Sequence, residues 1–293
     1  MTASDATNPV GTAAVTPRGG HLSYDLRGYR VTVDVPDPAA ARLVGSIFRE
    51  FAIPAHPDGA DAAYALRREG QSWTAADPRG IAYRSEALAD AVLALEWQIV
   101  TATIAHRRDC FHLHAAALLS PDASAALVIV GVSGSGKTTL TLGLMARGFL
   151  PYSDDATLID PDTCAPTAFR RAFHIDDGTR SLLLDLPEPP HWDFAAAPAG
   201  YFSPPRWAED PCPIRTVLFP TLVPGAAPAL APLAMADAAA RLLPFSATLA
   251  QSPPLALHTA ARIVASASCY DLVAGDLAQT LDLVIERVGR NRG

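Results

Sequence analysis

The feature that most constrains this chain is a glycine-rich stretch between an apolar run and a helical segment. The run from Leu127 to Val130 is apolar and rich in β-branched residues, as in a buried strand. The stretch that follows, GVSGSGKTT, fits the pattern G-x-x-x-x-G-K-[ST]. A strand, a glycine-rich turn and a helix in this order are typical of a phosphate-binding loop. The sequence therefore predicts an α/β fold with a nucleotide-binding sheet.

The residue types in this loop suit a nucleoside triphosphate. Glycines let backbone N–H groups converge on phosphates, and the first turn of the helix adds its own N–H groups and dipole. Lys137, the only lysine in the chain, is expected to reach the β- and γ-phosphates, and the Thr138 hydroxyl to bind Mg²⁺. The alternative is a purely structural glycine turn. We predict bound ATP and Mg²⁺, with nucleotide contacts from Gly131, Ser133, Gly134, Ser135, Gly136, Lys137, Thr138 and Thr139.

Charge and cysteine content exclude several classes of protein. The formal net charge of -7, without a basic stripe, argues against nucleic-acid binding. The four cysteines form no C-x-x-C pair, which favours reduced thiols over a zinc site or disulfides. No apolar run approaches the roughly 18 to 20 residues of a membrane span, and the first residues do not resemble a secretory signal. The sequence predicts a cytoplasmic protein with no nucleic-acid or membrane partner.

The chain divides into three parts, predicted as a disordered tail at 1–20, a small α/β subdomain at 21–106 and a phosphate-loop domain at 107–293. In the subdomain we expect a long helix, capped by Ser85 and ending near His106, that packs it against the rest of the chain. The other predicted subdomain elements are strands at 29–35, 63–68 and 72–76 and a helix at 39–51.

Around the loop, the pattern predicts a strand at 111–119, antiparallel to or near the loop strand, and a helix that stops at Gly148. A strand at 149–153 then leads to the acidic pair. Between Pro151 and Pro254 lie 18 of the 26 prolines, so we expect many loops there, suited to receiving an acceptor. The remaining predicted elements are strands at 169–175, 216–223 and 269–273 and helices at 235–243, 257–267 and 277–288.

Two adjacent aspartates end the strand at 149–153. Phosphoryl transfer requires one group to hold Mg²⁺ and one to orient or deprotonate the nucleophile. Adjacent side chains diverge at a strand end, so we assign Asp154 as the general base and Asp155 as a Mg²⁺ ligand. An ordinary Asp-Asp turn is the alternative. His112 and His114 alternate onto one face of the preceding strand, where a structural role is also open.

The order of these elements resembles a known family. A His-Ala-Ala strand, the glycine-rich loop, a helix ending in Arg-Gly and then Ser-Asp-Asp are similar to the HPr kinase/phosphorylase family, whose fold is shared with phosphoenolpyruvate carboxykinases. Weaker similarity at 217–220, 233–243 and 270–283 points to HPr-kinase-related proteins encoded beside peptide-modification genes, including lasso-peptide kinases. The resemblance implies catalytic roles for Asp154, His114 and Lys137, and it favours a homo-oligomer.

Departures from the family pattern bear on the acceptor. Val132 replaces an acidic residue, Thr138-Thr139 replaces Ser-Glu, and the downstream glycine-rich signature is missing, so HPr is disfavoured as the substrate. The predicted activity is ATP-dependent phosphorylation of a serine-type hydroxyl on a peptide, small protein or metabolite. The alternatives are a regulatory nucleotide-binding protein and a carboxykinase for a keto acid. Two alternatives are open for Arg170, Arg171 and Arg180. They either clamp the transferred phosphoryl group or an acidic peptide, or they are surface arginines.

Overall fold

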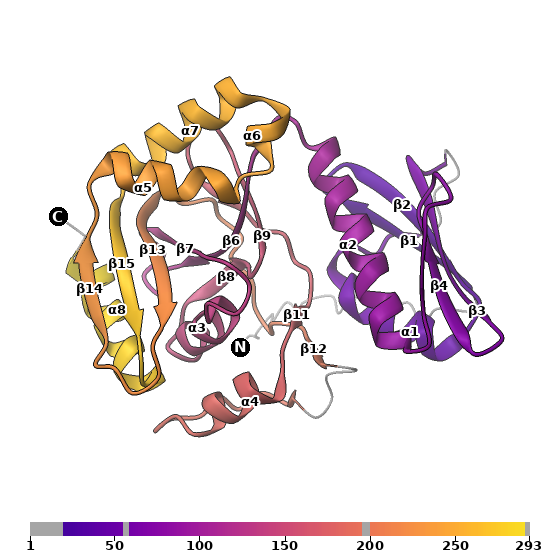
Figure 1. Ribbon diagram of the computed structural model, residues 1–293, viewed down its shortest axis with the longest axis horizontal. Helices are drawn as coiled ribbons and strands as arrows, with labels where there is room; N and C mark the ends of the chain where they lie inside the picture. Colours follow the sequence, from indigo (N-terminus) through magenta and orange to yellow (C-terminus); the bar gives the residue numbers. More distant parts are fainter. Residues whose placement is uncertain (1–19, 55–58, 195–199, 291–293) are drawn as a thin grey trace, which may run out of the picture.

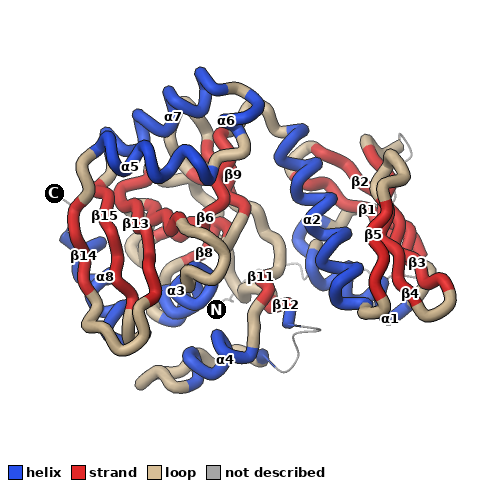
Figure 2. Tube along the Cα trace, viewed as in Figure 1, coloured by secondary structure: helices blue, strands red, loops and turns tan. Residues whose placement is uncertain are grey.

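The computed structural model describes residues 20–54, 59–194 and 200–290. Within these ranges the chain is a mixed α/β structure with a five-stranded, an eight-stranded and a two-stranded sheet (Figure 1, Figure 2). The segment predicted as a disordered tail lies outside the described residues, except for residue 20, which begins the first strand. The predicted α/β class is therefore confirmed.

The five-stranded sheet is formed by the amino-terminal part of the chain. Its strands follow in the order β1 (Gly20–Leu26), β2 (Tyr29–Val35), β3 (Ala62–Glu69), β4 (Ser72–Ala76) and β5 (Ala82–Ser85). The β2–β3 pair is parallel because helix α1 (Pro38–Ile47) makes the crossover between them, as parallel neighbours require. The predicted strand at 29–35 is confirmed. The predicted helix to Phe51 is too long, since α1 stops at Ile47 and only a 3₁₀ turn follows.

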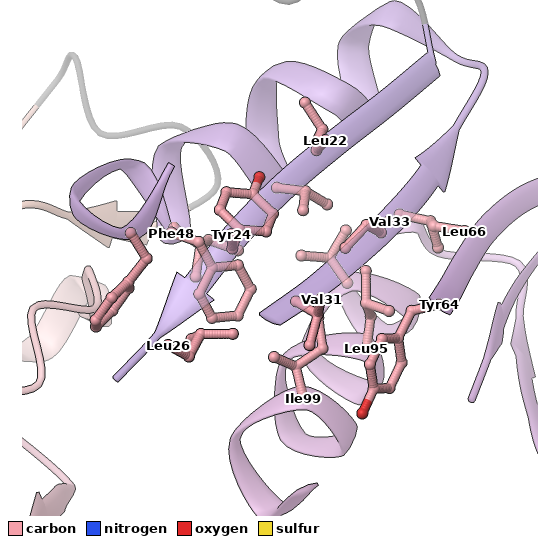
Figure 3. Packing of buried hydrophobic residues seen from close by; sticks show 14 of the residues in the cluster. Leu22, Tyr24, Leu26, Val31, Val33, Phe48, Tyr64, Leu66, Leu95 and Ile99 are labelled. Carbon is pink, nitrogen blue, oxygen red and sulfur yellow. The ribbon is translucent and has the colours of Figure 1, made fainter. Parts of the chain in front are cut away.

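Helix α2 (Leu88–His106) covers this sheet and lies on the side of it that faces the larger sheet (Figure 1). Leu95 and Ile99 of α2 are fully buried and pack in one cluster with Val31 and Tyr64 (Figure 3). The helix starts two residues later than predicted: its N-cap is Ala87, and Ser85 instead accepts a hydrogen bond from the Ala87 N–H at 3.1 Å.

The sequence predicted no segment that is long and apolar enough to span a membrane, and helix α2 contradicts this prediction. Among the residues that the structure describes, it is the one helix long and apolar enough to cross a bilayer by length and composition. A core helix passes the same test, and 33% of the relevant window is buried within the fold. Its buried face, which includes Val92, Leu95 and Ile99, packs in the cluster of the five-stranded sheet, whereas Leu93 and Trp97 are exposed.

The larger sheet carries the glycine-rich loop near its centre. Its strand order is β10-β9-β6-β7-β13-β15-β14, and β8 also pairs with β6. The loop strand β7 is parallel to β13, which is parallel to β15, whereas β6 is antiparallel to β7, β8 and β9. The bounds are β6 (Phe111–Leu119), β7 (Ala126–Val130), β8 (Leu150–Ser153), β9 (Ala156–Ile159), β10 (Pro166–Thr167), β13 (Ile214–Leu222), β14 (Ala229–Pro232) and β15 (Ser268–Ala274).

Helices cover both faces of this sheet and make three layers. One apolar cluster joins one face to α3 (Lys137–Ala146), α4 (Asp177–Leu184) and α8 (Leu277–Arg290). A second cluster joins the other face to α5 (Met235–Leu242) and α7 (Pro253–Ser266), with the short α6 (Thr248–Gln251) beside α7. The predicted elements after the loop are confirmed except at 169–175.

The strand predicted at 169–175 is wrong for most of its length. Only Phe173–His174 (β11) is a strand, and it pairs with Tyr201–Phe202 (β12). The residues before it are used differently: Phe169 and Ala172 are buried in the apolar cluster of the five-stranded sheet. This segment therefore connects the two large sheets instead of extending one of them.

Candidate active site

The register of β6 brings the predicted site residues to one edge of the larger sheet. Ala115 pairs with Val130 at the end of β7, and His114 pairs with Ala156 at the start of β9. The glycine-rich loop begins after Val130, and the acidic pair ends just before Ala156. His114 thus lies between the loop and Asp155, although these elements are far apart in sequence.

The glycines of the loop meet backbone and packing requirements. Gly134 and Gly136 have φ angles of 79° and 87°, the left-handed region that favours glycine. A Cβ atom at Gly131 would come within 2.6 Å of the Ser135 Oγ atom. Ser133 lies exposed at the tip, next to Gly134. The loop conformation therefore depends on glycine at three of the predicted positions.

Lys137 begins α3 and lies against the loop. Its side chain is buried, and Nζ donates to the carbonyl oxygens of Gly131 at 2.7 Å and Val132 at 3.2 Å. Burial lowers the pKa of Lys137, while the negative charges of Asp155 and Asp154 oppose this change. The ammonium is therefore placed between the glycine-rich loop and the acidic pair.

The other loop side chains point to different neighbours. Thr138 is half-buried in the first turn of α3, and the Thr139 hydroxyl forms a 2.9 Å hydrogen bond with that of Thr179 in α4. The Ser135 Oγ atom is buried and has no hydrogen-bond partner among the described residues, so it can bond to a ligand. A small pocket of about 70 Å³ lies beside the loop and is lined by Ser135, Gly136, Thr139, Leu140, Leu182, Pro220, Leu222, Ala274, Gly275, Leu277 and Thr280.

His114 and Asp155 form the exposed pair of the site. The His114 Nδ1 and Asp155 Oδ1 atoms are 3.1 Å apart, and both side chains are 41% exposed. Burial lowers the pKa of His114, Asp155 opposes this, and Lys137 and Arg171 lower it further. The net shift favours a neutral imidazole near pH 7, with Nδ1 donating to Asp155 and Nε2 left to accept a hydrogen bond or bind a metal.

His112 supports the structural alternative for one of the two histidines. It is buried, and its backbone N–H donates to the Thr248 hydroxyl at 2.8 Å. Burial lowers the pKa of His112 to about 4, so it stays neutral at physiological pH. His112 therefore belongs to the packing of β6 against α6.

Replacing Asp155 with asparagine is expected to lower the pKa of His114 further. The carboxylate is the group that raises this pKa against burial, so its loss favours the neutral imidazole. The midpoint is measured by following the His114 imidazole signals in NMR spectra as the pH is changed. Asp282→Asn, which removes an exposed carboxylate paired with Arg147, is the control. An unchanged or higher His114 midpoint in Asp155→Asn would contradict the pairing.

Asp154 points away from Asp155 into a buried ion-pair network. Its Oδ1 atom accepts a 3.1 Å hydrogen bond from Arg171 Nη2, and Arg171 Nη1 bonds to Glu96 Oε1 of α2. The Tyr201 hydroxyl donates to the other Glu96 oxygen at 2.5 Å. Burial raises the pKa of the Asp154 carboxyl to about 6, and the positive charge of Arg171 limits this rise. The two aspartates thus diverge, as expected for adjacent residues at a strand end.

The structure revises the predicted alternatives for the arginines. Arg171 is neither a surface residue nor free to clamp a phosphoryl group, because its side chain is only 11% exposed and holds two carboxylates. The Arg180 Nη1 atom lies 3.7 Å from the Oδ1 atom of the exposed Asp177. Sequence reasoning missed Glu96 and Tyr201. The available signal for Glu96 was a single acidic residue within the apolar run VLALEWQIV.

The residues present fit a Mg²⁺ ion only together with a nucleotide. In the described ranges, no group of three or more His, Cys, Asp or Glu side chains could hold a metal ion alone. Mg²⁺ is usually bound by one or two carboxylates, substrate phosphates and water. Asp155 and the Thr138 hydroxyl could complete such a set. The four cysteines form no disulfide, and three of them are buried.

Comparison with known proteins adds no assignment. Neither the models of known protein families nor the curated proteins contain a match to this chain. The class established by the structure is a mixed α/β protein with a glycine-rich strand-loop-helix at the centre of its larger sheet. The functional assignment therefore rests on the sequence motif and the geometry of the site.

Proposed function

We propose that this protein is an ATP-dependent kinase of the HPr kinase/phosphoenolpyruvate carboxykinase fold type. It transfers the γ-phosphoryl group to a serine-type hydroxyl of a peptide, small protein or metabolite. The observation that carries the proposal is the meeting of the loop lysine, His114 and the acidic pair at one sheet edge. A cytoplasmic location and a homo-oligomeric state belong to the same proposal.

Each group has a distinct role in this proposal. The loop N–H groups bind the phosphates, and Lys137 balances the charge of the β- and γ-phosphates. Thr138 and Asp155 would hold Mg²⁺, which when bound neutralises phosphate charge. His114 orients Asp155 through the contact between Nδ1 and Oδ1.

Asp154 acts as the general base in the transfer. Its carboxylate takes the proton of the acceptor hydroxyl as that oxygen forms a bond to the γ-phosphorus. The bond between the γ-phosphorus and the β–γ bridging oxygen breaks, and ADP leaves with that oxygen. Arg171 occupies one side of the buried Asp154 carboxylate, so the acceptor must approach from the loop side, near Lys137.

The proposal is tested by incubating the protein with Mg²⁺ and ATP labelled at the γ-phosphate. The acceptors are synthetic hydroxyl-bearing peptides, starting with any small peptide encoded beside the gene, followed by metabolites with a primary hydroxyl. We expect label on an acceptor hydroxyl, located by mass spectrometry, and none when EDTA removes Mg²⁺. Tight ATP binding without transfer to any acceptor would contradict the kinase and support the regulatory nucleotide-binding protein.

A further inference from the structure

A buried ion pair connects the amino-terminal helix α2 with the proposed base. Arg171 lies between Glu96 of α2 and Asp154 of the larger sheet, and Glu96 and Asp154 are 2% and 5% exposed. The chain around Arg171 is also anchored: Phe169, two residues before it, and Ala172, directly after it, are buried in the same apolar cluster as α2. The guanidinium is therefore held in place by its own chain and by both carboxylates.

This buried network differs from a surface salt bridge in its desolvation cost and in how narrowly it orients the side chains. Taking charged groups out of water is unfavourable unless each of them is paired and hydrogen-bonded. Here the planar guanidinium uses separate nitrogens for two carboxylates, and Tyr201 donates to the remaining Glu96 oxygen. Such a network fixes the direction in which Asp154 presents its second oxygen.

We propose that Arg171 and Glu96 are positioning residues that orient the Asp154 carboxylate for phosphoryl transfer. Helix α2 thereby contributes Glu96 to a site whose proposed catalytic residues lie on the larger sheet and on α3. The inference deepens the proposed function and rests on it for the role of Asp154. Tyr201 supports the same arrangement by holding Glu96.

Two substitutions test whether the ion pair positions the Asp154 carboxylate. Glu96→Gln removes the charge that anchors Arg171 from α2, and Arg171→Gln removes the guanidinium that donates to Asp154. Each is expected to lower kcat by about 10- to 100-fold, because a small displacement of a catalytic group slows the chemical step. The KM for ATP is expected to stay unchanged, because neither residue belongs to the proposed nucleotide site.

The experiment uses the full-length protein and two readouts. The first is kcat and the KM for ATP in transfer assays. The second is the NMR signal of the Asp154 carboxyl carbon at one fixed pH, in protein labelled with ¹³C aspartate and identified by its loss in Asp154→Asn. We expect the carboxyl signal to move in both variants, with kcat lowered and the KM for ATP unchanged.

Controls separate positioning from general stability. Arg67→Gln breaks the exposed pair with Asp34 in the same subdomain and is expected to leave both readouts unchanged. Arg171→Lys keeps the charge but lacks the planar fork of the guanidinium, so it replaces the glutamine variant if that protein does not fold, with the same expected loss of kcat. An unchanged carboxyl signal and an unchanged kcat in a folded Glu96→Gln protein would overturn the positioning role. A moved carboxyl signal in a protein without any transfer activity would keep the network and reject the proposed kinase.

Discussion

Replacement of Lys137 with alanine is expected to weaken ATP binding and to abolish measurable phosphoryl transfer. Loss of a charged hydrogen bond costs about 2 kcal/mol in binding, and loss of one preorganised donor lowers the rate by about 10²- to 10³-fold. No other lysine exists to compensate, and the ammonium lies between the loop and the acidic pair. ATP affinity is measured by calorimetry and transfer with labelled ATP.

The Lys137 variant needs a control for the loop itself, because Nζ donates to the carbonyls of Gly131 and Val132. Its thermal unfolding without nucleotide should therefore be compared with that of wild type. Lys137→Arg is an informative partner, since a planar guanidinium is wider than the compact ammonium and does not replace it in a phosphate-binding loop. Wild-type ATP affinity in a folded Lys137→Ala protein would refute the nucleotide site.

Replacement of Asp154 with asparagine is expected to reduce transfer by about 10²- to 10⁴-fold, the range for removal of a general base. The substitution keeps the shape of the side chain and an oxygen that can accept from Arg171, so Mg²⁺-ATP binding should persist. Equilibrium binding of nucleotide and single-turnover transfer measure the two effects separately. Full turnover in purified Asp154→Asn would remove the base assignment.

A pH profile and a variant of the neighbouring Asp155 test the role of Asp154 further. A base works when deprotonated, and burial raises the Asp154 pKa to about 6, so wild-type kcat/KM should fall as the pH drops below about 6. Residual activity in Asp154→Asn should lack this limb. Asp155→Asn is the matched variant: as a proposed Mg²⁺ ligand it should raise the Mg²⁺ concentration needed for transfer.

Much of the fold could be predicted because its signals are local. Glycines at 134 and 136 suit left-handed backbone, the apolar alternation at 29–35 suits a half-buried strand, and the spacing at 277–288 suits a helix face. The strand predicted at 169–175 was wrong because its apolar residues are divided between two clusters: Phe169 and Ala172 pack with the five-stranded sheet, and Phe173 and Ile175 with the larger one. The apolar pattern of a segment does not show which sheet or helix buries its side chains.

The candidate site also has a part that local sequence patterns predict and a part that depends on tertiary contacts. The sequence by itself determined the loop, its lysine and the adjacent aspartates, because each of these depends on spacing within a few residues. Only the tertiary structure decided that β6 places His114 beside Asp155 and that Arg171 joins Asp154 to Glu96. These contacts depend on strand register and on the packing of α2, and no short sequence pattern encodes a pairing across 75 residues.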